Sequence, residues 1–158
     1  LAWLPANMPQ DDGQVSLIHG DYRIDNIIFD PVEPKGIAVL DWELSTLGHP
    51  TADIAYFCMC LRLPKEGKIS GLRGVDRAAI GVPSEEEIVA QYCQARGIDT
   101  IENWNFYVIF SFFRLAAILQ GVYKRALDGN ASNKEASKVG AFVAPLAMAA
   151  LGVIKAES

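Results

Sequence analysis

The chain has 158 residues, of which 51% are hydrophobic and 21% charged, and its formal net charge is -5 at pH 7. This length fits one domain with a buried core, and the absence of a basic excess argues against a nucleic-acid partner. No apolar run reaches the roughly 18 residues of a membrane span, and the first residues lack the basic region of a signal peptide. We therefore expect a cytoplasmic protein with no membrane partner.

The first half of the chain contains three short apolar runs that predict β-strands, at residues 15–18, 26–30 and 36–42. The segment that joins the last two runs contains proline and glycine and predicts a hairpin connection. The polar sequence HGDYRIDN, residues 19–26, separates the first two runs. A polar loop is therefore expected between two strands that are able to be buried.

The second half has the pattern of helices. A helix is expected at about 51–62, with Thr51 as candidate N-cap. The next helix is predicted to begin after Ser84, because Ser84 and Glu87 have the spacing of a capping box. Gly97 predicts its end.

Two longer helices are expected after it. Residues 101–129 are apolar on nearly all sides, which predicts a central helix that is buried on most sides. Residues 132–157 predict a last helix, weakened or kinked by Gly140 and Pro145.

Residues 64–83, between the first two predicted helices, carry four basic side chains against Glu66 and Asp76. A local positive excess in an acidic chain is compatible with a loop that meets an anionic ligand. The other interpretation is a surface loop whose charges keep it solvated.

Two kinds of metal site are disfavoured. Cys58, Cys60 and Cys93 form no disulfide framework, and a C-x-C pair without a second pair makes a poor zinc site, so core thiols are expected. The pairs Gly20–Asp21 and Gly48–His49 are only a weak sign of a metallophosphoesterase, because the DxH and GNH[ED] motifs of that class are missing. We interpret His49 as part of a turn.

The polar residues of the first half suggest a different chemistry. A carboxylate such as Asp21 can orient a hydroxyl and take up its proton. Asn26 follows in the same loop, and Asp41 closes the strand run IAVLD, where an ionised group is costly unless it is paired or bound to a metal. Because Mg²⁺ is usually held by one or two carboxylates together with phosphate oxygens, these residues fit a metal-assisted phosphoryl transfer.

The same residues carry a family resemblance. HGDYRIDN resembles the HGDxxxxN catalytic loop of the aminoglycoside phosphotransferases and of related, choline-kinase-like small-molecule kinases. VLDWE, residues 39–43, is similar to their metal-binding segment. The run LDWELSTLGHPTADIAY is most similar to kinase-like domains found alone in bacteria or fused to acyl-CoA dehydrogenases. The resemblance implies an α+β fold, mainly α-helical, in which residues 1–158 are the C-terminal lobe of a protein-kinase-like fold with short β-strands carrying the catalytic and metal-binding loops.

The resemblance also implies roles for four acidic or amide side chains. Asp21 would be the catalytic base that orients the acceptor hydroxyl towards the γ-phosphate of ATP. Asn26 and Asp41 would bind Mg²⁺, and Glu43 would support a second metal ion or its waters.

Four other residues are assigned supporting or binding roles. His19 is expected to brace the loop by hydrogen bonds. Asp53 would support the loop from below, although an aspartate at a helix N-terminus is also favoured by the helix dipole. Arg23 is expected to form a local ion pair or to approach a phosphate. Arg114, among apolar neighbours, is expected to pair with a buried acid or to reach the acceptor pocket.

These assignments predict an ATP- and Mg²⁺-dependent phosphotransferase that acts on a small-molecule hydroxyl. Arg73 and Arg77 would suit an anionic acceptor such as a hydroxyacyl-CoA, while an aminoglycoside-like compound is the other candidate. A catalytically silent module that binds nucleotide or metabolite is the alternative function. The chain shows no GxGxxG loop and no strand lysine, so the N-terminal ATP-binding lobe is expected to lie outside residues 1–158 and this part alone to be inactive. The sequence does not indicate an oligomeric state.

Overall fold

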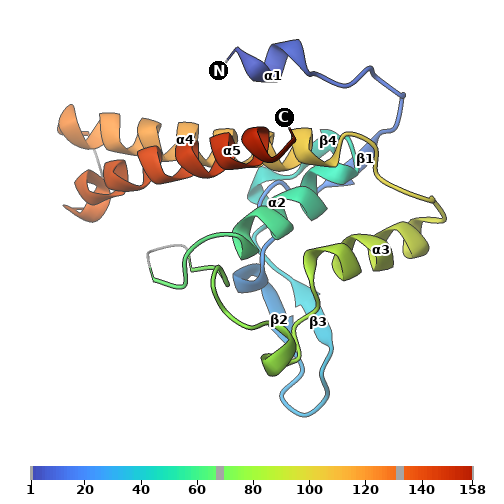
Figure 1. The fold of residues 1–158 in the computed structure, drawn as a ribbon. Helices are drawn as coiled ribbons and strands as arrows, with labels where there is room; N and C mark the ends of the chain where they lie inside the picture. Colours follow the sequence, from blue (N-terminus) through green and yellow to red (C-terminus); the bar gives the residue numbers. More distant parts are fainter. Residues whose placement is uncertain (1, 67–69, 131–133, 158) are drawn as a thin grey trace. The chain divides into compact units, whose positions relative to one another are not determined.

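The computed structural model describes residues 2–66, 70–130 and 134–157, except for the side chains of residues 134–137 and 157 (Figure 1). The chain divides into two compact units, one formed by Pro9–Trp104 and the other by Leu1–Met8 together with Asn105–Ser158. We describe each unit by itself.

The first unit contains two antiparallel pairs of short strands. Strand β1 (Ser16–Ile18) pairs with β4 (Thr46–Gly48), and β2 (Ile27–Phe29) pairs with β3 (Gly36–Val39). The three predicted strands and the hairpin are confirmed, whereas β4 was not predicted. Its short sequence, TLG, contains too few residues to show an alternation of apolar and polar side chains.

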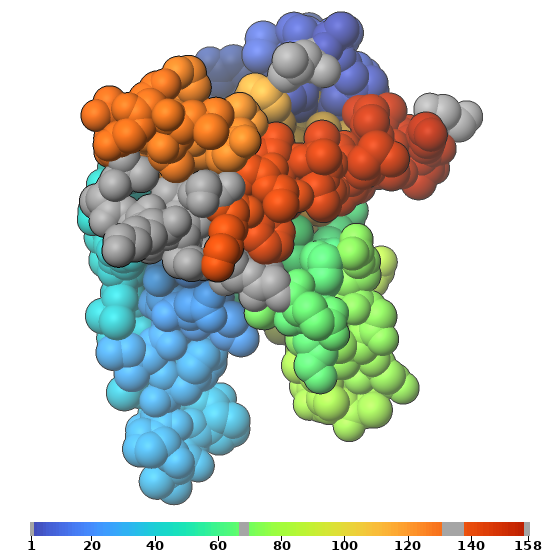
Figure 2. All heavy atoms as spheres, turned by 90° about the vertical axis from the view of Figure 1, so that its left-hand side faces the viewer, coloured from blue at the N-terminus to red at the C-terminus, as the bar shows by residue number. Residues whose placement is uncertain are grey.

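The strands are less buried than we expected. In Figure 2 the β2–β3 hairpin forms a narrow projection. Leu17 of β1 is 61% exposed, and Phe29 of β2 and Ile37 of β3 are half exposed. An isolated pair of strands leaves both faces without a covering layer, which accounts for this exposure.

Helix α2 (Thr51–Leu61) lies where it was predicted, but its N-cap is Pro50 and not Thr51. Pro50 already has helical backbone angles, so Thr51 is the first helical residue and its side chain is buried. The Thr51 N–H donates instead to Nδ1 of His49, at 3.3 Å. The turn at His49 therefore does the work that a capping side chain would do.

Helix α3 (Glu85–Arg96) has the predicted ends. The Ser84 hydroxyl accepts from the Glu87 N–H, and the Glu87 carboxylate accepts from the Ser84 N–H, which completes the capping box. Gly97 has a φ of 68°, the left-handed conformation that ends many helices.

The core of this unit lies between α2 and α3. Ile54 and Cys58 of α2 contact Cys93 of α3 and Ile101, with further partly buried side chains around them. The three cysteines are free and buried, as expected for core thiols. Burial raises the pKa of Cys58 and of Cys60 to about 12, so both remain neutral thiols near pH 7.

The second unit is helical. It contains α1 (Trp3–Ala6), α4 (Trp104–Leu127), a 3₁₀ segment (Lys134–Phe142) and α5 (Val143–Glu157). The stretch predicted as one helix over 132–157 is therefore α-helical only in its second part, and 132–133 lie outside the described residues. Pro145 is the third residue of α5, inside the first turn, where its missing N–H costs no hydrogen bond.

Helix α4 is not buried on most sides. Val108, Phe112 and Leu115 are buried, whereas Phe110 and Phe113 are 43% and 38% exposed. Helix α4 and residues 138–156 each have the length and hydropathy of a membrane span. Apolar helices of water-soluble proteins share these properties. The absence of a membrane partner stays a prediction.

Candidate active site

The HGD loop, residues 19–26, connects β1 to β2 and ends in a 3₁₀ turn, Ile24–Asn26. His19 is only 2% exposed, and Asn26 is also buried. Gly20 has a φ of 82°, and a Cβ atom placed there would lie 2.4 Å from the Leu44 carbonyl oxygen. The loop therefore requires glycine at this position, both for the backbone conformation and for the close approach.

His19 holds the loop against the strand that precedes Asp41. Its Nε2 lies 2.7 Å from the Leu40 carbonyl oxygen, and its Nδ1 accepts from the Asp21 N–H at 3.2 Å. This pair of partners selects the neutral tautomer with its proton on Nε2. The ring also packs on Trp42, with centroids 4.7 Å apart.

Asp53 supports the same loop from the first turn of α2. Its carboxylate accepts from the N–H groups of His19, at 2.6 Å, and of Gly20, at 2.9 Å. Hydrogen bonds from N–H groups to a carboxylate are stronger than those between neutral partners. The helix dipole also favours the negative charge at this position, so the two explanations given for Asp53 from the sequence act together.

Asp21 and Asn26 lie side by side in the loop. The Asn26 amide nitrogen donates to the Asp21 carbonyl oxygen at 2.9 Å and to Asp21 Oδ2 at 3.2 Å. These bonds orient the Asp21 carboxylate. Both use the amide nitrogen of Asn26, so its amide oxygen takes no part in them. The Leu40 N–H donates to the Asn26 backbone carbonyl at 2.8 Å, which brings the residue before Asp41 to the loop.

The position of Asp41 differs from the one predicted from the sequence. It does not end a buried strand: its side chain is exposed, as is that of Glu43, and its φ is 66°. A left-handed conformation at a residue other than glycine costs of order 1–3 kcal/mol, and such strain is concentrated at functional sites. The backbone turn, and not burial, is therefore the feature that singles out Asp41.

The donor chemistry of these residues fits Mg²⁺. No cluster of three or more His, Cys, Asp or Glu side chains able to hold a metal occurs in the described part of the chain. The Asn26 amide oxygen and the Asp41 carboxylate are hard oxygen donors, the type of ligand that Mg²⁺ takes beside substrate phosphates and water.

The four arginines predicted to bind substrate belong to different segments of the chain. Arg23 lies in the HGD loop, with its Nε 3.7 Å from Asp21 Oδ2 and its Nη2 3.3 Å from Asp25 Oδ2. Arg73 is exposed in the segment that follows α2, and Arg77 donates to the Leu61 carbonyl at 3.3 Å. Arg77 also lines a pocket of about 660 Å³ at the N-terminus of α3. Arg114 belongs to α4, in the other unit.

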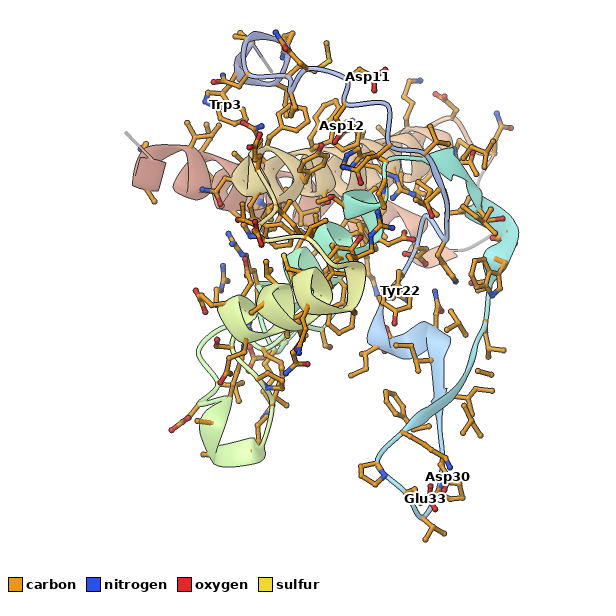
Figure 3. All side chains as sticks on the ribbon, turned by 90° about the vertical axis from the view of Figure 1, so that its right-hand side faces the viewer. Trp3, Asp11, Asp12, Tyr22, Asp30 and Glu33 are labelled. Atoms are coloured by element: carbon orange, nitrogen blue, oxygen red, sulfur yellow. The ribbon has the colours of Figure 1, made fainter. Side chains whose placement is uncertain are left out.

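Aromatic side chains next to the loop were not identified from the sequence. Trp42 packs on His19, and the Tyr22 ring lies 6.1 Å from His19 and 5.7 Å from Phe57. The signal available was their position directly after Asp41 and Asp21. Figure 3 shows Tyr22, which belongs to the HGD loop, and Asp30 at the far tip of the β2–β3 hairpin. There the N–H groups of Glu33 and Val32 hold the pKa of Asp30 below its ordinary value.

A model of the phosphotransferase enzyme family, which includes the aminoglycoside phosphotransferases, matches residues 1–105. The chain belongs to this family. Its mainly helical, kinase-like fold is confirmed by a crystal structure of a candidate aminoglycoside phosphotransferase from Ralstonia eutropha JMP134. That protein is 46% identical, with a TM-score of 0.88 over 98% of this chain and 47% of the other.

Curated relatives of this family member carry the name of another enzyme class. Acyl-CoA dehydrogenase family member 10 of Mus musculus is 49% identical over 93% of this chain, and family member 11 of Homo sapiens is 45% identical over 97%. The probable acyl-CoA dehydrogenase IBR3 of Arabidopsis thaliana is 43% identical over 99%. The chain spans 14% to 20% of the length of these relatives.

Proposed function

We propose that the protein carrying this chain is a kinase that uses ATP and Mg²⁺ to phosphorylate a hydroxyl group of a small molecule. Family membership supports phosphoryl transfer in general. The observation that carries the finer proposal is the joint placement of Asp21 and Asn26 in a loop fixed by His19 and Asp53. A base and a metal ligand held in one rigid loop are what phosphoryl transfer requires, because its catalysis is mostly positioning and charge stabilisation.

In this mechanism Asp21 accepts a hydrogen bond from the acceptor hydroxyl and takes its proton as the oxygen attacks phosphorus. Asn26 donates to Oδ2 of the Asp21 carboxylate, and the other carboxylate oxygen would accept the hydrogen bond from the hydroxyl. Asn26 and Asp41 would bind Mg²⁺, with Glu43 near its waters. When bound, the metal ion would neutralise charge on the phosphate oxygens.

An anionic acceptor, of the class of hydroxyacyl-CoA thioesters, is favoured over a polycation. The exposed Arg73 and the partly exposed Arg77 lie in the basic loop, residues 64–83. Positive side chains attract phosphate and carboxylate groups and repel the ammonium groups of an aminoglycoside. The names of the curated relatives, which refer to acyl-CoA dehydrogenases, point to the same substrate class.

The test uses the longest natural protein that contains this chain. It is incubated with ATP and Mg²⁺ and with hydroxyacyl-CoAs, aminoglycosides and amino alcohols, and ADP release and phosphorylated product are both measured. Asp21→Asn is expected to lower turnover by about 10²–10⁴-fold, the typical contribution of a general base. Asp11→Asn, at an exposed carboxylate of the same unit, is the matched control.

Two outcomes would contradict the proposal. If Asp21→Asn retains the activity of the wild type, Asp21 is not the base. If the protein binds nucleotide but phosphorylates none of the acceptors, it is a binding module that performs no transfer.

A further inference from the structure

The Arg23 guanidinium has more hydrogen-bond donors than acceptors around it. Its side chain is 26% exposed, but Nε is shielded from solvent and has no hydrogen-bond partner in the described part of the protein. The separations from Asp21 and Asp25, 3.7 and 3.3 Å, are those of ion pairs and exceed the usual 2.7–3.2 Å of an N–H···O bond.

A shielded N–H without an acceptor costs about 1–3 kcal/mol, and such groups are rare in folded proteins. The backbone conformation at Arg23 accounts for the position of its Nε–H group. Arg23 is extended, with φ -149° and ψ 164°, directly before the 3₁₀ turn that brings Asn26 back to Asp21. The fold therefore holds an unsatisfied donor next to the oxygen of Asp21 that Asn26 already binds.

The charge of the HGD loop indicates what the missing acceptor is. Arg23 is the only Lys or Arg within residues 19–26, which also contain Asp21 and Asp25. In phosphoryl transfer, negative charge is spread over the three equatorial oxygens of the group in flight, and a guanidinium is the side chain that best matches such oxygens. Asp25 is exposed, so its pairing with Arg23 can be exchanged for a ligand at little cost.

We propose that the Arg23 guanidinium exchanges Asp25 for an oxygen of the phosphoryl group during its transfer, a movement that uncovers the Nε–H and gives it this oxygen as acceptor. This inference rests on the proposed kinase function. In the step, a bond forms between the acceptor oxygen and the γ-phosphorus, and the bond from that phosphorus to the bridging oxygen breaks. The bridging oxygen leaves on ADP, and the hydroxyl proton moves to Asp21. The Arg23 guanidinium balances the charge of the equatorial oxygens.

The first experiment measures binding and needs no turnover. The 158-residue chain, labelled with ¹⁵N, is titrated with inorganic phosphate, and the Nε–H resonances of its arginines are followed by NMR. The resonance lost in Arg23→Lys is that of Arg23. Phosphate should shift this resonance saturably, while the Nε–H of Arg96, an exposed arginine of α3, does not move and chloride at equal ionic strength has no effect. An unchanged Arg23 resonance would overturn the proposal, and equal shifts of both arginines would reveal an adventitious ion only.

The second experiment measures turnover in the longer protein. Arg23→Gln should lower kcat by about 10²–10³-fold, as removal of a donor to a charged transition state does, with KM for the acceptor nearly unchanged. Arg23→Lys keeps the charge and should recover part of kcat, and Arg96→Gln serves as the matched control. If kcat falls while phosphate leaves the Arg23 resonance in place, Arg23 only positions Asp21 and the proposal is wrong. A wild type without turnover would defeat the kinase function alone, since the titration still decides the role of Arg23.

Discussion

The HGD loop was predicted to bind substrate and metal, whereas the basic loop was interpreted either as a ligand-binding loop or as a solvated surface loop, and the structure holds the two loops in different ways. In the HGD loop the side chains of His19, Asn26 and Asp53 form hydrogen bonds that fix the backbone. In the basic loop, backbone bonds from Leu72 and Arg73 to the end of α2 do this work. The first loop has its polar groups already committed to one geometry, as the proposed catalysis requires, whereas in the second Arg73 remains exposed to solvent.

The comparison predicts that equal substitutions in the two loops have unequal effects. Gly20 and Gly74 have nearly the same backbone angle, with φ of 82° and 80°, but only Gly20 has a neighbour where a Cβ would be placed. Gly20→Ala should lower the free energy of unfolding by about 3 kcal/mol or more, because the clash with the Leu44 carbonyl adds to the backbone strain. Gly74→Ala should cost only the strain, about 1 kcal/mol.

Denaturant titrations of the 158-residue chain, followed by tryptophan fluorescence, measure both changes. Similar losses for the two variants would show that the close contact at Gly20 is relieved without cost and that the HGD loop is no more rigid than the basic loop.

The next largest effect is tested by removing one aspartate that supports each loop. Asp53→Ala removes the acceptor of two N–H groups in the HGD loop and should destabilise the chain by about 2–4 kcal/mol. Asp76→Ala in the basic loop removes one exposed bond, to the Ala79 N–H, and should cost about 0.5–1 kcal/mol. Hydrogen exchange at the amides of His19 and Gly20 should accelerate only in Asp53→Ala. Unchanged exchange there would mean that water replaces the carboxylate without loss of order.

The two loops also show what the sequence could and could not predict. The HGD loop was predicted because its chemistry lies in one short stretch with a defined spacing, and the capping box of α3 was predicted for the same reason. The exposure of Phe110 and of the Asp41 side chain depends on which distant segments cover a residue, and no local pattern encodes this. The basic loop lies between these cases, since its charge is visible in the sequence but the neighbours of Arg73 are not.

The smallest effect is expected for charge removal in the basic loop. Arg73 is exposed, so Arg73→Gln should change the free energy of unfolding by less than about 0.5 kcal/mol. Arg77→Gln also loses the bond to the Leu61 carbonyl and should cost about 0.5–1.5 kcal/mol.

The same Arg73→Gln variant also tests the charge of the acceptor. If the acceptor is anionic, Arg73→Gln raises the KM for the acceptor several-fold at low salt and less at high salt, because mobile ions screen an exposed charge. Assays of the longer protein at two salt concentrations measure this difference. A KM that stays constant in both conditions would assign the basic loop to solvation alone, and the anionic acceptor would then have to be recognised elsewhere.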